Sequence, residues 1–195
     1  MNKVFFTADT HFGQERALIL SRRPFRSVKE MDDYMVDQWN GIIGPNDDVY
    51  HLGDFGDYSF RPKLNGNIHL ILGNYDKDFT VVHRTDKKIL KKMESYFIDI
   101  HTYTTLRIDD LNTDTENIIK DKVNILYLVH RPNDCIKDVS KVYNLFGHIH
   151  GRQKVKRYGI DVGVDANFFR PMSADDVVFY INAIVNGYYD DNVFE

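Results

Sequence analysis

The chain is poor in cysteine, proline and tryptophan, and its net charge is small. Its 195 residues include one cysteine, five prolines and one tryptophan. The single cysteine, Cys135, excludes an internal disulfide and is typical of a reducing compartment. A formal net charge of −4 argues against a surface that coats nucleic acid, although a local basic cleft stays open as an alternative. We therefore expect no extended nucleic-acid surface.

Long apolar runs are also absent. No segment approaches the ~20 apolar residues that a membrane span requires, so we expect no membrane partner. The opening residues MNKVFFTADTHF lack the apolar core of a signal peptide, because Asp9 and His11 interrupt it. We therefore expect a cytoplasmic protein. The length favours a single domain that covers residues 1–195.

Short runs rich in Val, Ile, Phe and Tyr alternate with segments of helical periodicity. The runs predict strands at 3–8, 48–52, 67–72, 123–129, 142–146 and 158–164. The periodic segments predict helices at 27–42, 86–97 and 173–185, the first and last with capping boxes. The polar run 109–122 is expected to be a hairpin loop or an exposed excursion. This alternation predicts an α/β fold, and two packed sheets would accommodate so many short strands.

Five of the predicted strands run into residues of metal-ligand type. These residues are Asp9 and His11, Asp54 and Asp57, Asn74 and Asp76, His130, and His148 and His150. Each motif alone has an ordinary explanation as turn chemistry or as a hydrogen-bonded core histidine. The carboxyl ends of strands converge on one crevice in open α/β sheets, so together they predict one polar cluster. The i, i+2 spacing in Asp-x-His and His-x-His would place both side chains on one face of an extended segment.

The same residues carry a resemblance to a known superfamily. The motifs Asp9-x-His11, Gly53-Asp54-x-x-Asp57, Gly73-Asn74-x-Asp76, His130 and Gly147-His148-x-His150 resemble those of the calcineurin-like metallophosphoesterases. The segments TADTHFG, VYHLGDF and GVDANFFRPMS are similar to those of its small single-domain bacterial and phage phosphoesterases. The resemblance implies a four-layer αββα sandwich of two mixed sheets flanked by helices. It also implies a dinuclear metal site at the carboxyl ends of the strands.

The resemblance also implies how two divalent metal ions would be held. One ion would be bound by Asp9, His11, Asp54 and His150. The other would be bound by Asn74, His130 and His148, with Asp54 as the bridging carboxylate. Imidazole, carboxylate and amide ligands suit Mn, Fe, Zn or Ni, and ligand type alone does not choose among them.

The implied activity is phosphoester hydrolysis through a metal-bridging hydroxide. We expect phosphodiesters to be preferred to simple alkyl monoesters, because a diester carries less charge and good leaving groups need less protonation. The substrate would be a phosphate-ester small molecule or a nucleotide, with nucleotide-type, cyclic or aryl phosphates as the candidates. The alternative is a metal-binding scaffold or protein-interaction module of the same fold with weakened catalysis.

The residue between Asn74 and Asp76 departs from the superfamily pattern. Relatives commonly carry there a histidine that contacts the phosphate and protonates the leaving oxygen, oriented by the following aspartate. This chain has Tyr75, whose ordinary pKa near 10 makes it a poor proton donor at neutral pH. Asn74, Tyr75 and Asp76 are nevertheless the candidate catalytic residues, and Tyr75 is also a candidate substrate contact.

Two further residues receive candidate roles outside the ligand set. The resemblance implies that Asp57 does not bind metal itself but orients a metal ligand or the nearby backbone. Arg131 either reaches the substrate phosphate or belongs to an ordinary loop. Residues 21–26, SRRPFR, are interpreted as a solvated loop, with a basic rim for a nucleotide as the alternative. The histidines outside the motifs, at 51, 69, 83 and 101, are interpreted as structural.

Overall fold

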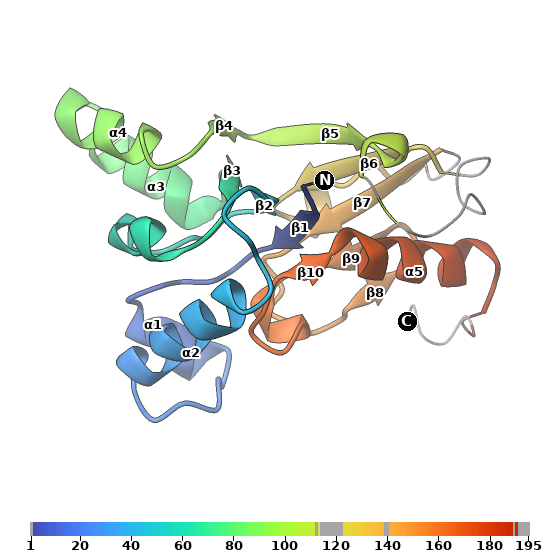
Figure 1. Cartoon of the computed structure of the whole chain (residues 1–195), viewed down its shortest axis with the longest axis horizontal. Coiled ribbons are helices and arrows are strands. Elements are labelled where there is room, and N and C mark those ends of the chain that lie inside the picture. Colours follow the sequence, from blue (N-terminus) through green and yellow to red (C-terminus); the bar gives the residue numbers. More distant parts are fainter. Residues whose placement is uncertain (1, 112, 114–122, 139–140, 189, 191–195) are drawn as a thin grey trace.

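The computed structural model describes residues 2–111, 113, 123–138, 141–188 and 190, which form a mixed α/β structure (Figure 1). The first sheet has the strand order β10-β1-β2-β3-β4. Its strands are β1 (Val4–Thr7), β2 (Asp48–His51), β3 (Asn67–Ile71), β4 (Asp99–His101) and β10 (Met172–Ser173). β1 to β4 run parallel, and β10 pairs antiparallel with β1 at one edge. This sheet is therefore mixed.

The second sheet is also mixed and has the order β5-β6-β7-β9-β8. Its strands are β5 (Tyr103–Arg107), β6 (Ile125–Val129), β7 (Val142–Phe146), β8 (Val155–Lys156) and β9 (Gly159–Asp161). β6, β7 and β9 run parallel, while β5 and β8 are antiparallel edge strands.

The described helices are α1 (Glu15–Leu20), α2 (Val28–Asn40), α3 (Asn74–Val82), α4 (Lys87–Glu94) and α5 (Ala174–Val185). Short 3₁₀ segments, η1 to η4, span Tyr58–Lys63, Ile108–Asp110, Pro132–Asp134 and Val164–Ala166. The six predicted strands and three predicted helices are confirmed, with small differences at their ends. The sequence did not indicate α1, α3, β4, β5, β8 or β10. Most of the predicted excursion 109–122 lies outside the described residues.

Helix starts follow the predicted capping chemistry with one difference. The Ser173 hydroxyl accepts from the backbone of Asp176, whose carboxylate reaches back to the Ser173 backbone, so this capping box is confirmed. At α2 the Ser27 side chain accepts from Glu30 N as expected. The Glu30 carboxylate, however, accepts from Arg26 N, one residue earlier than a capping box requires.

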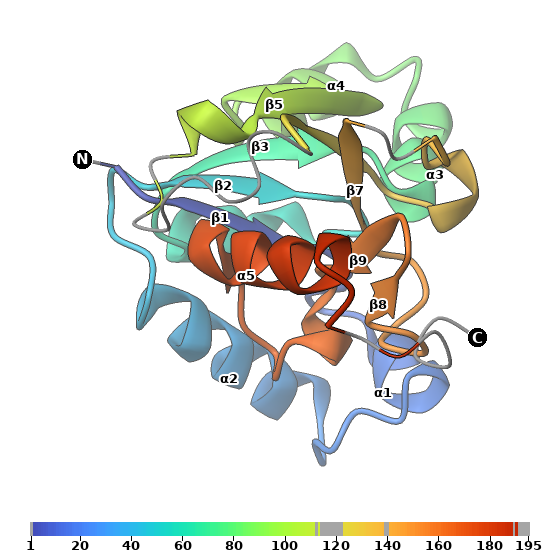
Figure 2. The same ribbon diagram turned by 90° about the vertical axis from the view of Figure 1, so that its right-hand side faces the viewer.

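The main core lies between the two sheets. Phe6 and Leu52 of the first sheet and Leu128 and Leu145 of the second are fully buried in one cluster, which also includes Ile181 of α5. Figure 2 shows α5 crossing beside β1 and β9, where its apolar face closes one side of the sandwich. Burial of these side chains is the dominant favourable contribution to folding.

Helices cover the opposite face of the first sheet. Met31, Met35 and Trp39, spaced at helical intervals on α2, pack in a second cluster with Val49 and Ile68. Their helical spacing thus places all three on the buried face of α2. Val49 and Ile68 alternate with residues that face the other sheet, as expected for strands buried on both sides.

A third apolar cluster lies on the outer face of the second sheet. It contains Val129, Phe146 and Cys135, with Tyr127 and Tyr158 packed against them. Within the described part of the chain, no helix contributes to this cluster. Burial raises the pKa of the Cys135 thiol to about 12, so this cysteine is not a nucleophile at neutral pH.

Each helix of the described residues is too short or too polar to cross a membrane.

Candidate metal centre

The polar residues that follow the parallel strands meet in two groups. Each group consists of three side chains whose ligand atoms lie within 4.8 Å of one another. The groups are Asp9, His11 and His150, and Asp54, His130 and His148. All six residues belong to the predicted ligand set, and the strand ends that carry them are β1, β2, β6 and β7. The prediction that these distant segments converge is therefore confirmed.

The seventh predicted ligand, Asn74, lies beside the second group. It is the first residue of α3, and its Oδ1 lies 3.1 Å from His130 Nε2. The amide oxygen is an acceptor that coordinates cations without adding charge.

The backbone at these residues is left-handed rather than extended. Among the described residues, eight that are not glycine have positive φ, and five of them are predicted ligands. These five are Asp9, His11, Asp54, His148 and His150, with φ between 49° and 73°. The expectation that Asp-x-His and His-x-His are extended segments is therefore wrong: Asp9 and His11 lie in one group, whereas His148 and His150 lie in different groups. Such strained conformations concentrate at functional sites.

Two glycines allow the loops to approach one another closely. A Cβ atom on Gly73 would lie 2.2 Å from Asp54 Oδ1, and one on Gly147 would lie 2.6 Å from Asp9 Oδ2. No side chain fits at such distances. The glycine that precedes each ligand motif is therefore required by packing of the backbone against a ligand carboxylate.

The hydrogen bonds of His130 leave its Nε2 atom facing two acceptors. Its Nδ1–H donates to the backbone oxygen of Leu52 at 2.7 Å, which assigns the tautomer. Nε2 then faces Asp54 Oδ2 at 3.4 Å and Asn74 Oδ1 at 3.1 Å. Three lone-pair atoms converge here, and such an arrangement needs a cation or a proton between them.

Without a metal, the proton takes that place. Burial lowers the pKa of His130, but the hydrogen bond to Asp54 and the charges of Asp9 and Asp54 outweigh it and raise the pKa to about 9. A divalent cation would compete with this proton for the same lone pairs.

His11 and His150 are oriented in the same way as His130. His11 Nδ1–H donates to Gln14 Oε1 at 2.8 Å, and His150 Nδ1–H donates to Asp165 Oδ2 at 2.7 Å. Both rings therefore present Nε2 as the ligand atom. Metal-binding histidines almost always donate their other N–H to a carboxylate, carbonyl or amide oxygen.

The two carboxylate oxygens of Asp54 have different environments. Oδ1 accepts from Tyr75 N at 2.9 Å. Oδ2 lies 3.4 Å from His130 Nε2 of the second group and 3.8 Å from His11 Nε2 of the first group. Asp54 Oδ2 thus lies between the two groups, where a shared ligand would have to be.

Asp9 is a fully buried carboxylate with one oxygen unpaired. Its Oδ2 accepts from His148 N at 2.7 Å, whereas Oδ1 has no hydrogen-bond partner in the described structure. Burial raises the pKa of Asp9 to about 7, with smaller opposing effects from the charges of His130 and His150. An orphaned, buried anionic oxygen is costly unless a cation pairs with it.

Two of the remaining histidines of the site, His11 and His148, favour the neutral form that metal binding requires. Burial lowers the pKa of His11 to about 4, and burial also lowers the pKa of His148. His150 does not favour that form: burial lowers the pKa of His150, but the hydrogen bond to Asp165 and the charges of Asp9 and Asp165 outweigh it and raise the pKa. The residues present therefore fit two divalent cations in donor type and orientation, and the cations would have to displace the protons of His130 and His150.

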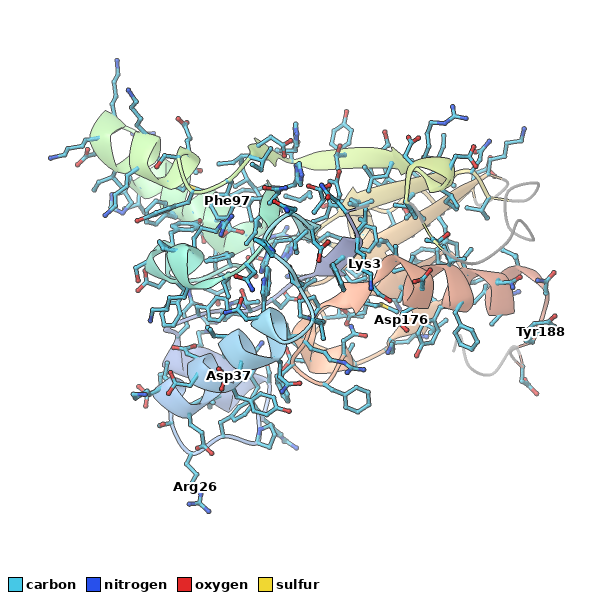
Figure 3. The ribbon with its side chains drawn as sticks, viewed as in Figure 1. Lys3, Arg26, Asp37, Phe97, Asp176 and Tyr188 are labelled. Carbon is cyan, nitrogen blue, oxygen red and sulfur yellow. The ribbon has the colours of Figure 1, made fainter. Side chains whose placement is uncertain are left out.

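A buried ion pair, which sequence reasoning missed, supports the first group from behind. Arg23 is 5% exposed and forms two hydrogen bonds with Asp165, the partner of His150. Its guanidinium also donates to the backbone oxygens of Asp9 and Thr10. The predictions that residues 21–26 form a solvated loop or a basic rim are wrong for Arg23. Figure 3 shows that Arg26, by contrast, projects outward.

Asp165 lies in the segment GVDANFFRPMS, which had been noted only for its resemblance. The presence of a charged residue in that segment was the only sign of a role for Asp165, and nothing in the sequence linked Asp165 to His150. The role of Gln14 was also missed. Its side chain accepts from His11, three residues earlier in the same loop.

Tyr75 borders the first group. Its ring meets the His11 ring edge-on, with centroids 5.2 Å apart. The guanidinium carbon of Arg16, an exposed residue, lies 5.7 Å from the Tyr75 ring centroid. These residues, together with Gln14 and His150, line a small pocket of about 30 Å³.

Asp76 is directed away from this pocket. Its Oδ2 accepts from Asp54 N at 2.6 Å and from Gly73 N at 2.9 Å, and its Oδ1 accepts from the Tyr58 hydroxyl at 2.9 Å. The carboxylate therefore links, through hydrogen bonds, the turn that contains Asp54 and the turn that precedes Asn74. The structure does not place it where it would orient the side chain at position 75.

Asp57 and Arg131 are both exposed. Asp57 caps η1 by accepting from Ser59 N at 2.8 Å, so the described contacts do not support its predicted role behind a ligand. Arg131 precedes η3, and its charge contributes to the lowered pKa of His148. Arg131 is thus a cation close to the second group.

Comparisons with known proteins give relatives without an established activity. No family model matches the chain. The "Uncharacterized protein MJ1445" of Methanocaldococcus jannaschii is 29% identical over 122 residues, covering 52% of this chain and 69% of that protein. The "Gene 66 protein" of Mycobacterium phage L5 is 25% identical over 206 residues, covering 94% of this chain and 96% of that protein.

One solved structure is similar to the chain over most of its length. It is the crystal structure of the protein of unknown function AQ665 from Aquifex aeolicus, with a TM-score of 0.64. The similarity covers 92% of this chain and 99% of that one at 21% identity. This similarity shows the fold alone.

Proposed function

We propose that this protein is a two-metal phosphoester hydrolase, as its resemblance to the calcineurin-like metallophosphoesterases implies, and that it acts on phosphodiesters in preference to simple alkyl monoesters, because a diester carries less charge and a good leaving group needs less protonation. One observation carries the proposal. Asp54, a member of the second group of ligand side chains, has its Oδ2 atom within 3.8 Å of a histidine nitrogen of each group.

The proposed ligand assignment follows these groups. Asp9, His11 and His150 hold one cation, and His130, His148 and Asn74 hold the other, with Asp54 shared between them. When bound, a pair of divalent cations supplies Lewis-acid activation of water and of the phosphoryl group. The unpaired oxygen of Asp9 and the three tethered imidazoles support this donor set.

The residues around the centre support the proposal that esters with good leaving groups are the preferred substrates. Arg16 and Arg131 are exposed cations near the first and second groups, and both are suited to attract a phosphate. Tyr75 offers a hydroxyl donor in place of a proton-donating imidazole, and Asp76 is occupied by backbone contacts. Esters with good leaving groups need little protonation, so they tolerate this site best.

The four-layer arrangement of the resemblance is also part of the proposal. Three of these layers have support in the packing of the two sheets face to face and in the helical cover on the outer face of the first sheet. The described residues contribute no helix to the apolar cluster on the outer face of the second sheet.

The test measures metal-dependent hydrolysis. Protein loaded with Mn²⁺ is assayed on bis-p-nitrophenyl phosphate and on p-nitrophenyl phosphate, with and without chelator. We expect activity on the diester that chelator abolishes, and lower activity on the monoester. His130→Ala should reduce the activity by about 100-fold or more, since it removes a ligand and exposes the Asp54 charge. The matched control is His101→Ala, at an exposed histidine of β4, which should leave activity unchanged.

Two outcomes would contradict the proposal in different parts. Equal or greater monoester activity would remove the diester preference. Binding of two metal ions without hydrolysis of any phosphate ester would favour the alternative of a metal-binding scaffold.

A further inference from the structure

A cavity of about 410 Å³ lies among four segments: the loop Phe12–Gln14, the loop Gly56–Ser59, α3 and α4. Its walls are mainly apolar and aromatic. The apolar lining residues are Phe12, Tyr58, Phe79, Ile89, Met93 and Tyr96. A volume of this size and an apolar lining are typical of small-molecule sites.

The cavity adjoins the metal centre through Gln14. This residue lines the cavity and also lines the small pocket beside Tyr75 and His150. Its side-chain oxygen holds His11 Nδ1 at 2.8 Å. The cavity and the first ligand group thus share a wall.

Helix α3 makes a second connection. It begins at Asn74, beside His130, and Tyr75 in its first turn lines the small pocket. Phe79 lies four residues further along and lines the cavity. Residues four apart share one face of a helix, about 6 Å apart along its axis. One helix face therefore leads from the metal ligands to the cavity.

The polar groups of the cavity indicate its ligand. Asp57, Ser59 and Lys92 line it and are exposed, so both acceptors and donors border the aromatic walls. The Phe79 and Tyr58 rings meet edge-on, with centroids 5.0 Å apart. A planar ring with hydrogen-bonding edges, such as a nucleobase, fits this lining better than an aliphatic chain does, because its faces are apolar and its edges are polar.

We propose that this cavity, the base pocket, binds the nucleobase of a nucleotide-type phosphodiester whose phosphate lies at the metal centre. This inference rests on the proposed function for its placement of the phosphate. It narrows the substrate class from nucleotide, cyclic or aryl esters to esters of nucleosides.

Three p-nitrophenyl diesters with the same leaving group test the base pocket. They carry a methyl group, a benzyl group or a thymidine 5′-yl group as the second substituent. We expect kcat/KM with the Mn²⁺-loaded protein to be at least about 10-fold higher for the thymidine ester than for the methyl ester. The benzyl ester should fall between them, because it fills the pocket without using its polar edge.

A variant that fills the cavity and a matched control test whether the difference in kcat/KM between the esters arises in the base pocket. Ile89→Trp places a larger ring in the cavity, whereas Val81→Trp adds the same ring at an exposed α3 residue that does not line it. Ile89→Trp should reduce kcat/KM for the thymidine ester to the value for the methyl ester. Val81→Trp should change neither rate. Equal rates for the three esters, or an equal loss on all of them in Ile89→Trp, would overturn the base pocket.

A binding measurement separates the base pocket from the proposed catalysis. Calorimetry compares thymidine 5′-monophosphate with methyl phosphate on the Mn²⁺-loaded proteins, whether or not any ester is hydrolysed. The base pocket predicts at least about 10-fold tighter binding of the nucleotide, and a loss of this difference in Ile89→Trp but not in Val81→Trp. Equal affinities for both phosphates would overturn it even if the diesterase activity were present.

Discussion

At the scale of single residues, the position of one oxygen atom distinguishes Asp54 from the other acidic residues. Oδ2 faces a histidine of each group, while Oδ1 is held by Tyr75 N. Asp54→Asn should therefore lose bound metal at both sites together with activity, because the neutral amide cannot neutralise two neighbouring cations. Metal content after Mn²⁺ loading and gel filtration measures the effect.

Asp57→Asn is the matched control for that substitution. Asp57 is exposed and caps η1, so the variant should keep both metal ions and lose at most about 1 kcal/mol of folding free energy. Full metal occupancy in Asp54→Asn would contradict the shared role of this carboxylate.

Tyr75 carries a second prediction at the residue scale. A histidine at this position would meet no orienting carboxylate, since Asp76 is bound to the backbone of Asp54 and Gly73. Tyr75→His should therefore change rates by less than about 10-fold across diesters whose leaving groups differ in pKa. A rate gain that grows with the leaving-group pKa would show that the introduced imidazole acts as a general acid and would contradict this reading of Asp76.

Residue types were more predictable than backbone conformations. The seven ligand candidates followed from their chemistry and their places after strands. The left-handed backbone conformations of Asp9 and His148 could not be predicted from the sequence. Aspartate and histidine adopt that region in a minority of cases, and the surrounding contacts decide where they do so. Arg23 and Asp165 were missed for a related reason, since their pairing joins segments 142 residues apart.

At the scale of elements, the turn from β3 into α3 connects the sheet to the candidate metal centre. Gly73 lies at this turn, with its backbone packed against Asp54. Gly73→Ala would place a Cβ atom 2.2 Å from Asp54 Oδ1 and 2.4 Å from Asp54 N. We expect a loss of about 1–3 kcal/mol in unfolding free energy, together with weaker metal binding, because the turn must move away from Asp54.

Gly44→Ala provides the control, measured by the same urea unfolding and metal titration. Its Cβ atom would first meet a side-chain oxygen of Asp47, at 3.3 Å, which is able to move. A change within about 0.5 kcal/mol is expected there. Equal stability of the two variants would mean that the β3–α3 turn tolerates displacement.

The elements themselves were predictable in proportion to their length and periodicity. β6 and α2 have clear patterns and were confirmed. β8 and β10 have two residues each, too few for any alternation to be visible. α3 was missed because its first turn contains the polar residues Asn74 and Asp76, which are typical of a loop. In the structure Asp76 accepts from the backbone of Gly73 at the helix start, and Asn74 contacts His130.

At the scale of the whole molecule, a buried histidine outside the ligand set couples folding to pH. His51 is fully buried, and Gly53 N donates to its Nδ1 at 3.3 Å while its Nε2–H donates to the Thr10 hydroxyl at 2.9 Å. The Thr10 hydroxyl in turn donates to Phe55 O at 2.8 Å. A second proton on Nδ1 would displace the Gly53 N–H. This arrangement confirms the structural role predicted for His51.

The sign of the pH effect follows from the direction of the pKa shift. Burial lowers the pKa of His51 to about 3, with smaller effects from the charges of Asp54, which raises it, and of His130 and His11, which lower it. The unfolded chain, with an ordinary histidine pKa of about 6.5, therefore binds more protons at pH values between about 3 and 6.5. The stability that the neutral ring contributes is complete above about pH 6.5 and is lost as the pH falls below it.

We therefore expect the unfolding free energy of chelator-treated protein to fall by about 2 kcal/mol more between pH 7.5 and pH 5 than in His51→Gln. Glutamine keeps a donor and an acceptor but does not titrate, so the difference between the two pH slopes isolates His51 from the titrating ligands of the metal centre. Urea unfolding at several pH values measures both slopes. Parallel slopes would mean that His51 gains its proton in the folded protein near its ordinary pKa, and that the Gly53 and Thr10 hydrogen bonds do not hold it neutral.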